Sequence, residues 1–404
     1  MPFDVEKARA DFPILSREIK GKPLVYLDSG ASAQKPNAVI DAMSYAMRHS
    51  YANVHRGLHT LANETTDAYE AGRETVARFI GAQTNEIIFT KSATESINLV
   101  ANTWGESLQA GDVILTTEME HHANIVPWYM LAERKGVKLV YVPILDDGSL
   151  DMAAFDQLLT PKVKLVCVTH MSNVLGTINP VADIIARVHA VGAKVMVDGC
   201  QGVVHLPVDI KALDADFYAF SAHKLYGPTG LGVLYAKAEL LEAMPPWQGG
   251  GEMIAHVTKE KITWNEPPHR FEAGTPAILE VIGLKAAIDW LSQFGRTEVI
   301  AHEHALYQRA HDALTQINSL RVHGEAPGKG SILTFSLGQA HAHDVAQILD
   351  RYNVAVRAGT HCAEPLMTRL GVTSTVRASI ALYNTEAEID VLAEAVAKAQ
   401  SFFA

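Results

Sequence analysis

Residues 216–228 read Asp-Phe-Tyr-Ala-Phe-Ser-Ala-His-Lys-Leu-Tyr-Gly-Pro, an apolar run that passes directly into a polar turn. A short apolar and aromatic run of this kind is typical of a buried β-strand. Six similar runs surround it, at residues 86–90, 112–116, 137–144, 163–169, 194–198 and 232–235. Segments with helical periodicity separate them, which predicts an α/β fold with a mainly parallel sheet. Ligands of such sheets bind at the carboxyl ends of the strands, where the polar turns lie.

The C-terminal part of the chain predicts a second, smaller unit. Residues 245–276 are rich in Pro and Gly and indicate an irregular connection. Beyond it the pattern predicts three strands and one helix, at residues 332–337, 354–358, 375–381 and 344–352 respectively. A capping box from Thr385 to Glu388 begins a final helix. We therefore expect three regions: an N-terminal segment that packs with the small domain (1–20), a large domain (21–265), and a connection followed by the small α/β domain (266–404).

The composition excludes several classes of protein. The chain has 404 residues, and its 34 Lys and Arg against 45 Asp and Glu give a net charge of −11, which disfavours binding to nucleic acid or anionic membranes. The three cysteines, Cys167, Cys200 and Cys362, lie too far apart for a C-x-x-C framework and suit a reducing compartment. The longest apolar stretch, residues 139–145, is far shorter than a membrane span needs, and no targeting segment is visible. We expect a cytoplasmic protein.

Lys224 is the first candidate for chemistry, because it follows a predicted buried strand. Burial at that position would lower the pKa of its amine and favour Schiff-base chemistry. Ser221 and His223 flank it with donors suited to a phosphate. The alternative is a surface lysine at the end of a strand.

Asp198 is the second candidate, at the end of the predicted strand 194–198. A carboxylate buried there needs a partner, and the protonated nitrogen of a pyridine ring is one. Gln201, three residues on, could donate to a ring substituent. The alternative is an aspartate that caps the next helix.

Two further polar turns follow predicted strands. Residues 90–96 open a helix whose free N–H groups form an anion site, although the same residues also match a capping box that needs no ligand. In residues 118–124, His121 could stack on an aromatic cofactor and move protons. Its neighbour His122 would point away from it, so we expect no metal site.

These motifs occur in the order found in pyridoxal-phosphate-dependent enzymes of the class V aminotransferase fold, and the chain resembles that family. The shared motifs are Ser-Ala-His-Lys224-x-x-Gly-Pro, Asp198-x-x-Gln201, Glu120-His121 and Ser172-Asn-Val-Leu-Gly176. Within the family the chain is similar to cysteine desulfurases of group II, the Suf and Csd type. The deciding segment is Arg357-Ala-Gly-Thr-His-Cys-Ala-Glu-Pro-Leu366, followed by Arg377-Ala-Ser. The resemblance covers essentially the whole chain and includes residues 26–31, 53–57 and 270–276.

The resemblance implies an aspartate aminotransferase-like fold of type I, with a seven-stranded sheet in the large domain. It also implies that Lys224 carries pyridoxal 5'-phosphate, that Asp198 keeps the pyridine nitrogen protonated, and that His121 stacks on the ring. Gln201 would donate a hydrogen bond to the ring oxygen. The phosphate would be held by Ala93, Thr94, Ser221 and His223, with Thr275 from the second subunit of a homodimer.

The resemblance further implies the reaction. Asn173 and Arg377 would bind the carboxylate of L-cysteine, and the thiolate of Cys362 would attack the substrate sulfur to give L-alanine and a persulfide. Arg357 and His361 would supply positive charge beside Cys362, and His121 would handle the sulfur proton. Arg357, His55 and Arg56 are further substrate-binding candidates. The persulfide would pass to an acceptor protein of the SufE type for iron–sulfur cluster assembly.

Alternatives remain open from the sequence. L-selenocysteine is a second substrate that the same site could process, which would make the chain a selenocysteine lyase. A transaminase or another lyase of class V would keep the cofactor without sulfur transfer, and a scaffold would keep only the fold. The chain departs from many relatives at Ala93, which lacks a phosphate-binding hydroxyl, and at Thr360, where some relatives have His. Cys167 and Cys200 are expected to be packing thiols.

Overall fold

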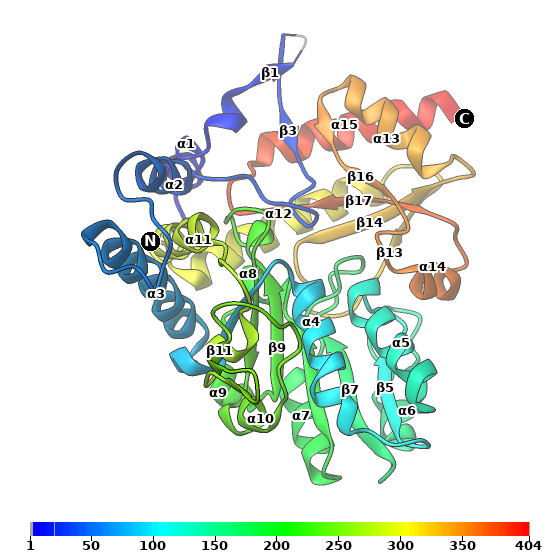
Figure 1. Ribbon diagram of the computed structural model, residues 1–404. Helices are drawn as coiled ribbons and strands as arrows, with labels where there is room; N and C mark the ends of the chain where they lie inside the picture. Colours follow the sequence, from blue (N-terminus) through cyan, green and yellow to red (C-terminus); the bar gives the residue numbers. More distant parts are fainter. Residues whose placement is uncertain (1–2, 20, 404) are drawn as a thin grey trace.

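A seven-stranded sheet forms the centre of the large domain in this computed structural model, which describes residues 3–19 and 21–403. The strand order is β4-β10-β9-β8-β7-β5-β6, and every neighbouring pair from β9 to β6 is parallel, whereas β10 is antiparallel to both of its neighbours. The predicted mainly parallel sheet is confirmed (Figure 1). Its strands are β4 (Ile87–Thr90), β5 (Val113–Thr117), β6 (Lys138–Val142), β7 (Val163–Thr169), β8 (Lys194–Asp198), β9 (Phe217–Ser221) and β10 (Gly232–Ala236).

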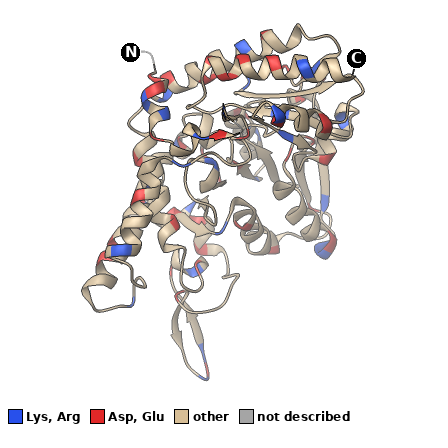
Figure 2. Cartoon of the chain, turned by 90° about the horizontal axis from the view of Figure 1, so that it is seen from above, with Lys and Arg blue, Asp and Glu red and all other residues tan. Residues whose placement is uncertain are grey.

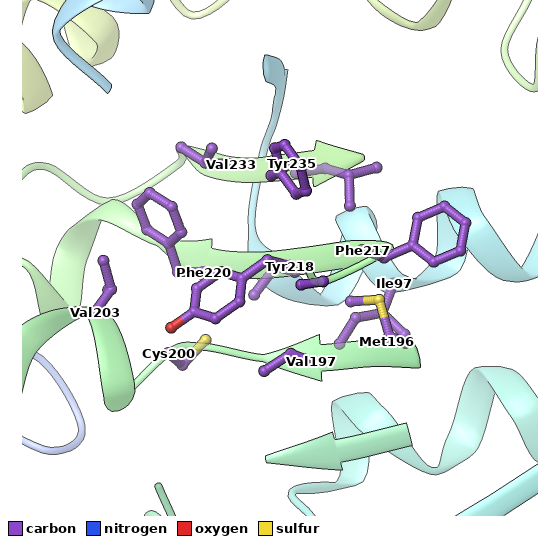
Figure 3. Packing of buried hydrophobic residues seen from close by; sticks show 14 of the residues in the cluster. Ile97, Met196, Val197, Cys200, Val203, Phe217, Tyr218, Phe220, Val233 and Tyr235 are labelled. Carbon is purple, nitrogen blue, oxygen red and sulfur yellow. The ribbon is translucent and has the colours of Figure 1, made fainter. Parts of the chain in front are cut away.

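The central strands are apolar on both faces because helices and loops cover the sheet on both sides. All residues of β9 and β10 are buried, and Figure 3 shows Phe217, Tyr218 and Phe220 of β9 packed between the neighbouring strands. The helices in the first 291 residues are α1 (Val5–Ala10), α2 (Asn37–His49), α3 (Thr60–Ile80), α4 (Ala93–Asn102), α5 (Val126–Lys135), α6 (Met152–Leu158), α7 (Val181–Ala190), α8 (Gly202–His205), α9 (Ile210–Leu213), α10 (Ala238–Ala243) and α11 (Ile278–Leu291). Short 3-10 helices are η1 (Pro13–Ser16), η2 (Thr84–Glu86), η3 (Trp104–Ser107), η4 (His122–Asn124), η5 (Ala222–Lys224) and η6 (His269–Phe271).

A four-stranded antiparallel sheet, ordered β13-β14-β17-β16, builds the small domain around a second hydrophobic cluster. The predicted strand 354–358 is two elements, because β15 leaves this sheet and pairs in parallel with β3. The predicted capping box is confirmed: the Thr385 N–H donates to Glu388 (3.1 Å), and the Glu388 N–H donates to Thr385 (3.3 Å). The elements are β13 (Leu320–His323), β14 (Ile332–Leu337), β15 (Val354–Ala355), β16 (Arg357–Gly359), β17 (Thr375–Ser379), α12 (Arg296–Thr315), α13 (Ala342–Arg351), α14 (Glu364–Leu370) and α15 (Glu386–Phe403).

The N-terminal segment lies where the two hydrophobic clusters meet. Phe12 packs edge-on against Trp290 and Tyr383, and Arg9 forms a 2.8 Å ion pair with Glu388 of α15. Three short strands belong to this part of the chain: β1 (Glu18–Ile19), β2 (Lys22–Pro23) and β3 (Val25–Tyr26). Since β3 pairs with β15, the chain contacts the small domain again directly before Asp28. The predicted division at residues 20 and 265 stays a prediction.

The region 245–276 is more regular than the sequence predicts. It contains a hairpin, β11 (Ile254–Val257) paired with β12 (Ile262–Trp264). The prediction of a wholly irregular connection is wrong here. Six of these residues pair across the hairpin, although most of the two strands is exposed and shows no buried face. Charged residues of both signs are interspersed over the chain rather than gathered on one face (Figure 2). Within the described residues, no helix combines the length and apolar character that crossing a membrane requires.

Candidate active site

Polar turns that follow five strands meet at one edge of the large sheet. They enclose a cavity of about 270 Å³, to which the small domain contributes residues from β16, β17 and the loop between them. The predicted site residues that line this cavity are Ala93, Thr94, His121, Asn173, Asp198, Ser221, His223, Lys224, Arg357, Cys362 and Arg377. Sequence positions almost 300 apart therefore share one cavity, as expected for the carboxyl edge of a parallel sheet.

Lys224 ends η5, directly after β9. The backbone carbonyl of the preceding residue, His223, accepts hydrogen bonds from the Ala33 N–H (3.1 Å), the Lys35 Nζ (3.1 Å) and the Ser32 Oγ (3.4 Å). Three donors on one carbonyl fix the turn, so that Lys224 is held at the cavity wall. Burial, with the nearby Lys224, lowers the pKa of the His223 ring to about 4, so the ring is neutral at pH 7.

Asp198 ends β8 and is 5% exposed. One carboxylate oxygen accepts a 3.0 Å hydrogen bond from the Cys200 N–H, and no ion pair to Asp198 is present within residues 3–19 and 21–403. The turn beyond it passes close over Tyr218. A Cβ at position 199 would lie 1.9 Å from that ring, so only glycine fits there. Figure 3 shows Cys200 directly beside Tyr218. A buried carboxylate without a cationic partner faces this cavity and is suited to a protonated ring nitrogen.

The amino end of α4 forms the anion-binding part of the wall. Ser92 caps the helix by accepting the Glu95 N–H (3.3 Å), so the predicted cap is present. The Ala93 N–H donates to Ser221 Oγ (2.9 Å), which ties the end of β9 to the helix. Ala93 and Thr94 still line the cavity beside His223, and the helix dipole favours an anion there.

His121 follows β5 and enters the cavity with a defined protonation state. Its Nδ1 accepts the Ala123 N–H (3.0 Å), which leaves Nε2 as the protonated ring nitrogen. Burial and the charge of Lys224 lower the pKa of His121 to about 4, so at pH 7 the ring is neutral and its Nε2–H is a hydrogen-bond donor. The neighbouring Glu120 is fully buried and accepts hydrogen bonds from Asn124 (2.7 Å) and the Thr169 N–H (2.8 Å), which fix this loop to β7.

The small domain places Cys362 at the cavity through a strained turn. His361 and Cys362 both have left-handed backbones, with φ of 53° and 55°, a conformation that non-glycine residues adopt only when their surroundings enforce it. The Cys362 carbonyl accepts the His122 N–H (2.7 Å), and the His361 carbonyl accepts Asn173 Nδ2 (3.0 Å). Cys362 is exposed, whereas Cys167 and Cys200 are buried, as predicted for the two packing thiols.

Arg357 and Arg377 bring positive charge to the cavity wall that also holds Cys362. Burial and the charge of Arg377 lower the pKa of His361 to about 3, so the expectation that His361 supplies positive charge is wrong. The position of His361 in the sequence does not show that its ring is buried and bonded to the Thr375 hydroxyl (2.9 Å). Arg377 is 2% exposed, and it donates through Nη1 to the Asn173 carbonyl (2.9 Å).

Four predicted site residues do not line this cavity. Gln201 is buried and donates to the Gly30 carbonyl (2.9 Å), whereas Thr275 lines a different cavity of about 390 Å³. His55 pairs with Glu70 (2.9 Å), and Arg56 pairs with Glu252 (2.9 Å). Their roles in the site stay predictions.

Sequence reasoning missed the contribution of the loop 28–35. Gly30 and Ala31 line the cavity, and Asp28 binds both arginines of the small domain. A signal was present, because an acid follows the apolar run 24–27 just as Asp198 follows its strand. Among the residues that the structure describes, no three His, Cys, Asp or Glu side chains gather closely enough to hold a metal ion.

The buried histidines predict a loss of stability on acidification. His170 does not line the cavity, its Nδ1 bonds the Tyr218 hydroxyl (3.0 Å), and burial lowers its pKa to about 4. Between about pH 6.5 and pH 4 the unfolded chain binds one more proton at this histidine, so the free energy of unfolding falls as the pH falls. The contribution is at most about 1.4 kcal/mol per pH unit.

Urea unfolding of the holoenzyme from pH 7 to pH 5 measures this loss. His170→Asn keeps a group at the Nδ1 position, and we expect it to reduce the pH dependence of the unfolding free energy. His304→Asn on an exposed surface controls for the loss of a histidine as such. An unchanged pH dependence in His170→Asn would contradict the assignment.

Comparison with known proteins identifies the family. The profile of the family Aminotransferase class-V matches residues 25–392. A cysteine desulfurase of Klebsiella pneumoniae is 54% identical over 395 residues, which cover 97% of each chain. The crystal structure of the cysteine desulfurase CsdA (S-sulfonic acid) from Escherichia coli matches with a TM-score of 0.92 at 43% identity and covers 99% of each chain. A C-DES mutant with glycine covalently linked to its pyridoxal phosphate cofactor matches with a TM-score of 0.80 at 25% identity, over 96% of this chain and 98% of that one. The chain therefore belongs to the aminotransferase class-V family.

Proposed function

We propose that this chain is a pyridoxal-phosphate-dependent cysteine desulfurase. The observation that carries the proposal is the joint position of Lys224, Cys362 and Arg377 on one cavity, with the cysteine exposed and the arginine buried. The relatives that match over the full length are named cysteine desulfurase, so the alternative of a selenocysteine lyase is not favoured. A transaminase needs no exposed cysteine at this place.

The residues at the cavity fit the cofactor. The buried carboxylate of Asp198 would hold the ring nitrogen protonated, the amino end of α4 with Ser221 and His223 would hold the phosphate, and Lys224 would carry the aldehyde carbon. His121 would lie against the ring. The cofactor, when bound, supplies an electron sink that labilises bonds at the substrate Cα and Cβ.

The side chains of this chain would perform the remaining work. Arg377 would bind the substrate carboxylate, since a guanidinium matches two carboxylate oxygens at once, and Asn173 would fix the arginine through its carbonyl. The freed amine of Lys224 would take the Cα proton. His121, neutral at pH 7, would hold the substrate sulfur through its Nε2–H.

Cys362 would then accept the sulfur. Its Sγ attacks the substrate sulfur, an S–S bond forms, and the Cβ–S bond breaks with its electron pair left on the substrate carbon, which gains a proton. L-cysteine and the Cys362 thiol thereby become L-alanine and a Cys362 persulfide, with no external oxidant. Attack needs the thiolate form of Cys362.

Turnover of L-cysteine by the purified holoenzyme with a thiol reductant tests the function. We expect alanine and sulfide in equal amounts, because each turnover releases one alanine and leaves one reducible sulfur. Pyruvate or ammonia in place of alanine would contradict a desulfurase. We further propose delivery of the persulfide to an acceptor protein of the SufE type within the reducing cytoplasm, since three free cysteines suit such a compartment.

We also propose a homodimer in which Thr275 completes the neighbouring site. Two observations support it: Thr275 lies away from the cavity of its own chain, and large apolar side chains are exposed on and after α2. The latter are Tyr45, Met47, Tyr51 and Leu58.

Mixing two impaired variants tests this arrangement. Lys224→Ala destroys its own site, and Thr275→Ala is expected to weaken the partner's site about tenfold or more through loss of a phosphate contact. A mixed dimer has one site with both residues intact, so activity should rise when the variants are unfolded together and refolded. Activity equal to the average of the two separate variants would contradict the shared site.

A further inference from the structure

Asp28 lies between the two arginines of the small domain. It follows β3 and forms a backbone bridge with Ser379 at the end of β17. Arg357 binds its carboxylate through two bonds, Nε to Oδ1 (3.1 Å) and Nη2 to Oδ2 (2.9 Å). Arg377 reaches the same carboxylate with Nη2 at 3.4 Å. One carboxylate therefore serves two guanidinium groups at the wall of the cavity.

The two arginines are held unequally. Arg357, whose side chain is 48% exposed, binds both carboxylate oxygens of Asp28 through its Nε and Nη2. Arg377 donates Nη1 to the Asn173 carbonyl, holds Asp28 only at 3.4 Å, and leaves Nε buried without a partner. Each guanidinium has five N–H donors, so both arginines keep donors for a second carboxylate, and what they share is the single negative charge of Asp28.

The charges around Arg357 and Arg377 also indicate that Asp28 limits the attraction of the site for a carboxylate. Burial lowers the pKa of Arg377 to about 10, and Asp28 is the group that opposes this shift most. The remaining neighbours that act on it are Arg357, which repels it, and Cys362. The negative charge of Asp28 thus compensates part of the positive field that an incoming carboxylate would meet.

We propose that Asp28 is a positioning residue that sets how tightly the site holds a monocarboxylate. Its negative charge offsets part of the positive charge of Arg357 and Arg377, so that the site holds the carboxylate less tightly and releases it after the reaction. The inference rests on the proposed function, in which substrate and product are amino acids with the same carboxylate. Release of the product then depends on the partial neutralisation by Asp28.

Binding of propionate to the holoenzyme, measured by calorimetry, tests the proposal without turnover. Asp28→Asn removes the charge and keeps the shape, and we expect propionate to bind about tenfold or more tightly, since an opposite charge at this range shifts such equilibria by at least that factor. Asp312→Asn, on an exposed part of α12, controls for the change in net charge. Unchanged or weaker binding in Asp28→Asn would overturn the proposal.

Steady-state kinetics with L-cysteine separates tuning from a merely structural role. Tighter binding of substrate and product lowers KM and kcat together in Asp28→Asn, whereas a misplaced Arg377 would raise KM. Asp28→Ser is a second neutral variant for which the same signs are expected. If both neutral variants fail to fold while Asp28→Glu folds, the proposal is overturned, because a tuning residue must be dispensable for folding.

The two proposals can fail separately. If the wild-type protein makes no alanine from L-cysteine but propionate binds more tightly to Asp28→Asn, the proposed reaction is wrong and the role of Asp28 stands. If alanine forms and propionate binding does not tighten, the reaction stands and the role of Asp28 is wrong.

Discussion

Lys224→Ala is expected to lower the rate of alanine formation from L-cysteine by about 10⁴-fold. The amine is the group that carries the cofactor and takes the Cα proton, and removal of a positioned acid–base group alone costs about 10²–10⁴-fold. No other amine lines this cavity within the described residues. Lys35 lies behind the turn and donates to the His223 carbonyl.

Two measurements check this expectation. The absorbance band of a lysine-bound cofactor should be absent from the variant, and added methylamine should restore part of the rate by acting as an external amine. Lys285→Ala on the surface of α11, where the lysine pairs with Asp289, serves as the matched control. A variant that keeps more than a small percentage of the wild-type rate would remove Lys224 from the mechanism.

Cys362→Ser is expected to lower alanine formation by about 10²-fold or more, since a serine hydroxyl remains protonated where a thiol ionises and no S–S bond can form. Serine keeps the size of the side chain, so the left-handed turn and the carbonyl bond to His122 should persist. The cofactor band and the melting temperature should therefore match the wild type.

Alkylation provides an independent check on Cys362. Among the three cysteines it is the exposed one, so limiting iodoacetamide should label one thiol per chain and abolish activity in step with labelling. Burial raises the pKa of Cys200 to about 12 and keeps that thiol unreactive. Sulfide release that survives full labelling of Cys362 would show that another group receives the sulfur.

The sheet and its strand-end residues were predictable because each signal is local. A buried strand must be apolar, and its polar turn follows within one or two residues, as at Asp198 and Lys224. Parallel topology then brings these turns together without further information. The resemblance to a family added the small-domain residues Cys362 and Arg377, which no local pattern places near the sheet.

The remaining features depend on contacts that a local pattern does not contain. Gln201 faces the Gly30 carbonyl, and His361 is neutral because other elements bury it. The hairpin β11–β12 has no buried face to produce an alternating pattern. The role of Asp28 depends on arginines that lie more than 300 residues further along the chain.

That separation has a consequence for how the enzyme is made. Asp28 and Arg377 are 349 residues apart, and a ribosome that adds roughly 5–20 residues per second needs roughly 20–70 s to travel between them. The strands of the large sheet have all been synthesised well before that time. The residues that would face the cofactor are therefore synthesised early, whereas the part of the site that would admit an amino acid needs residue 377. A chain truncated before residue 377 would carry Lys224 and Asp198 but would lack the arginine proposed to bind the substrate carboxylate.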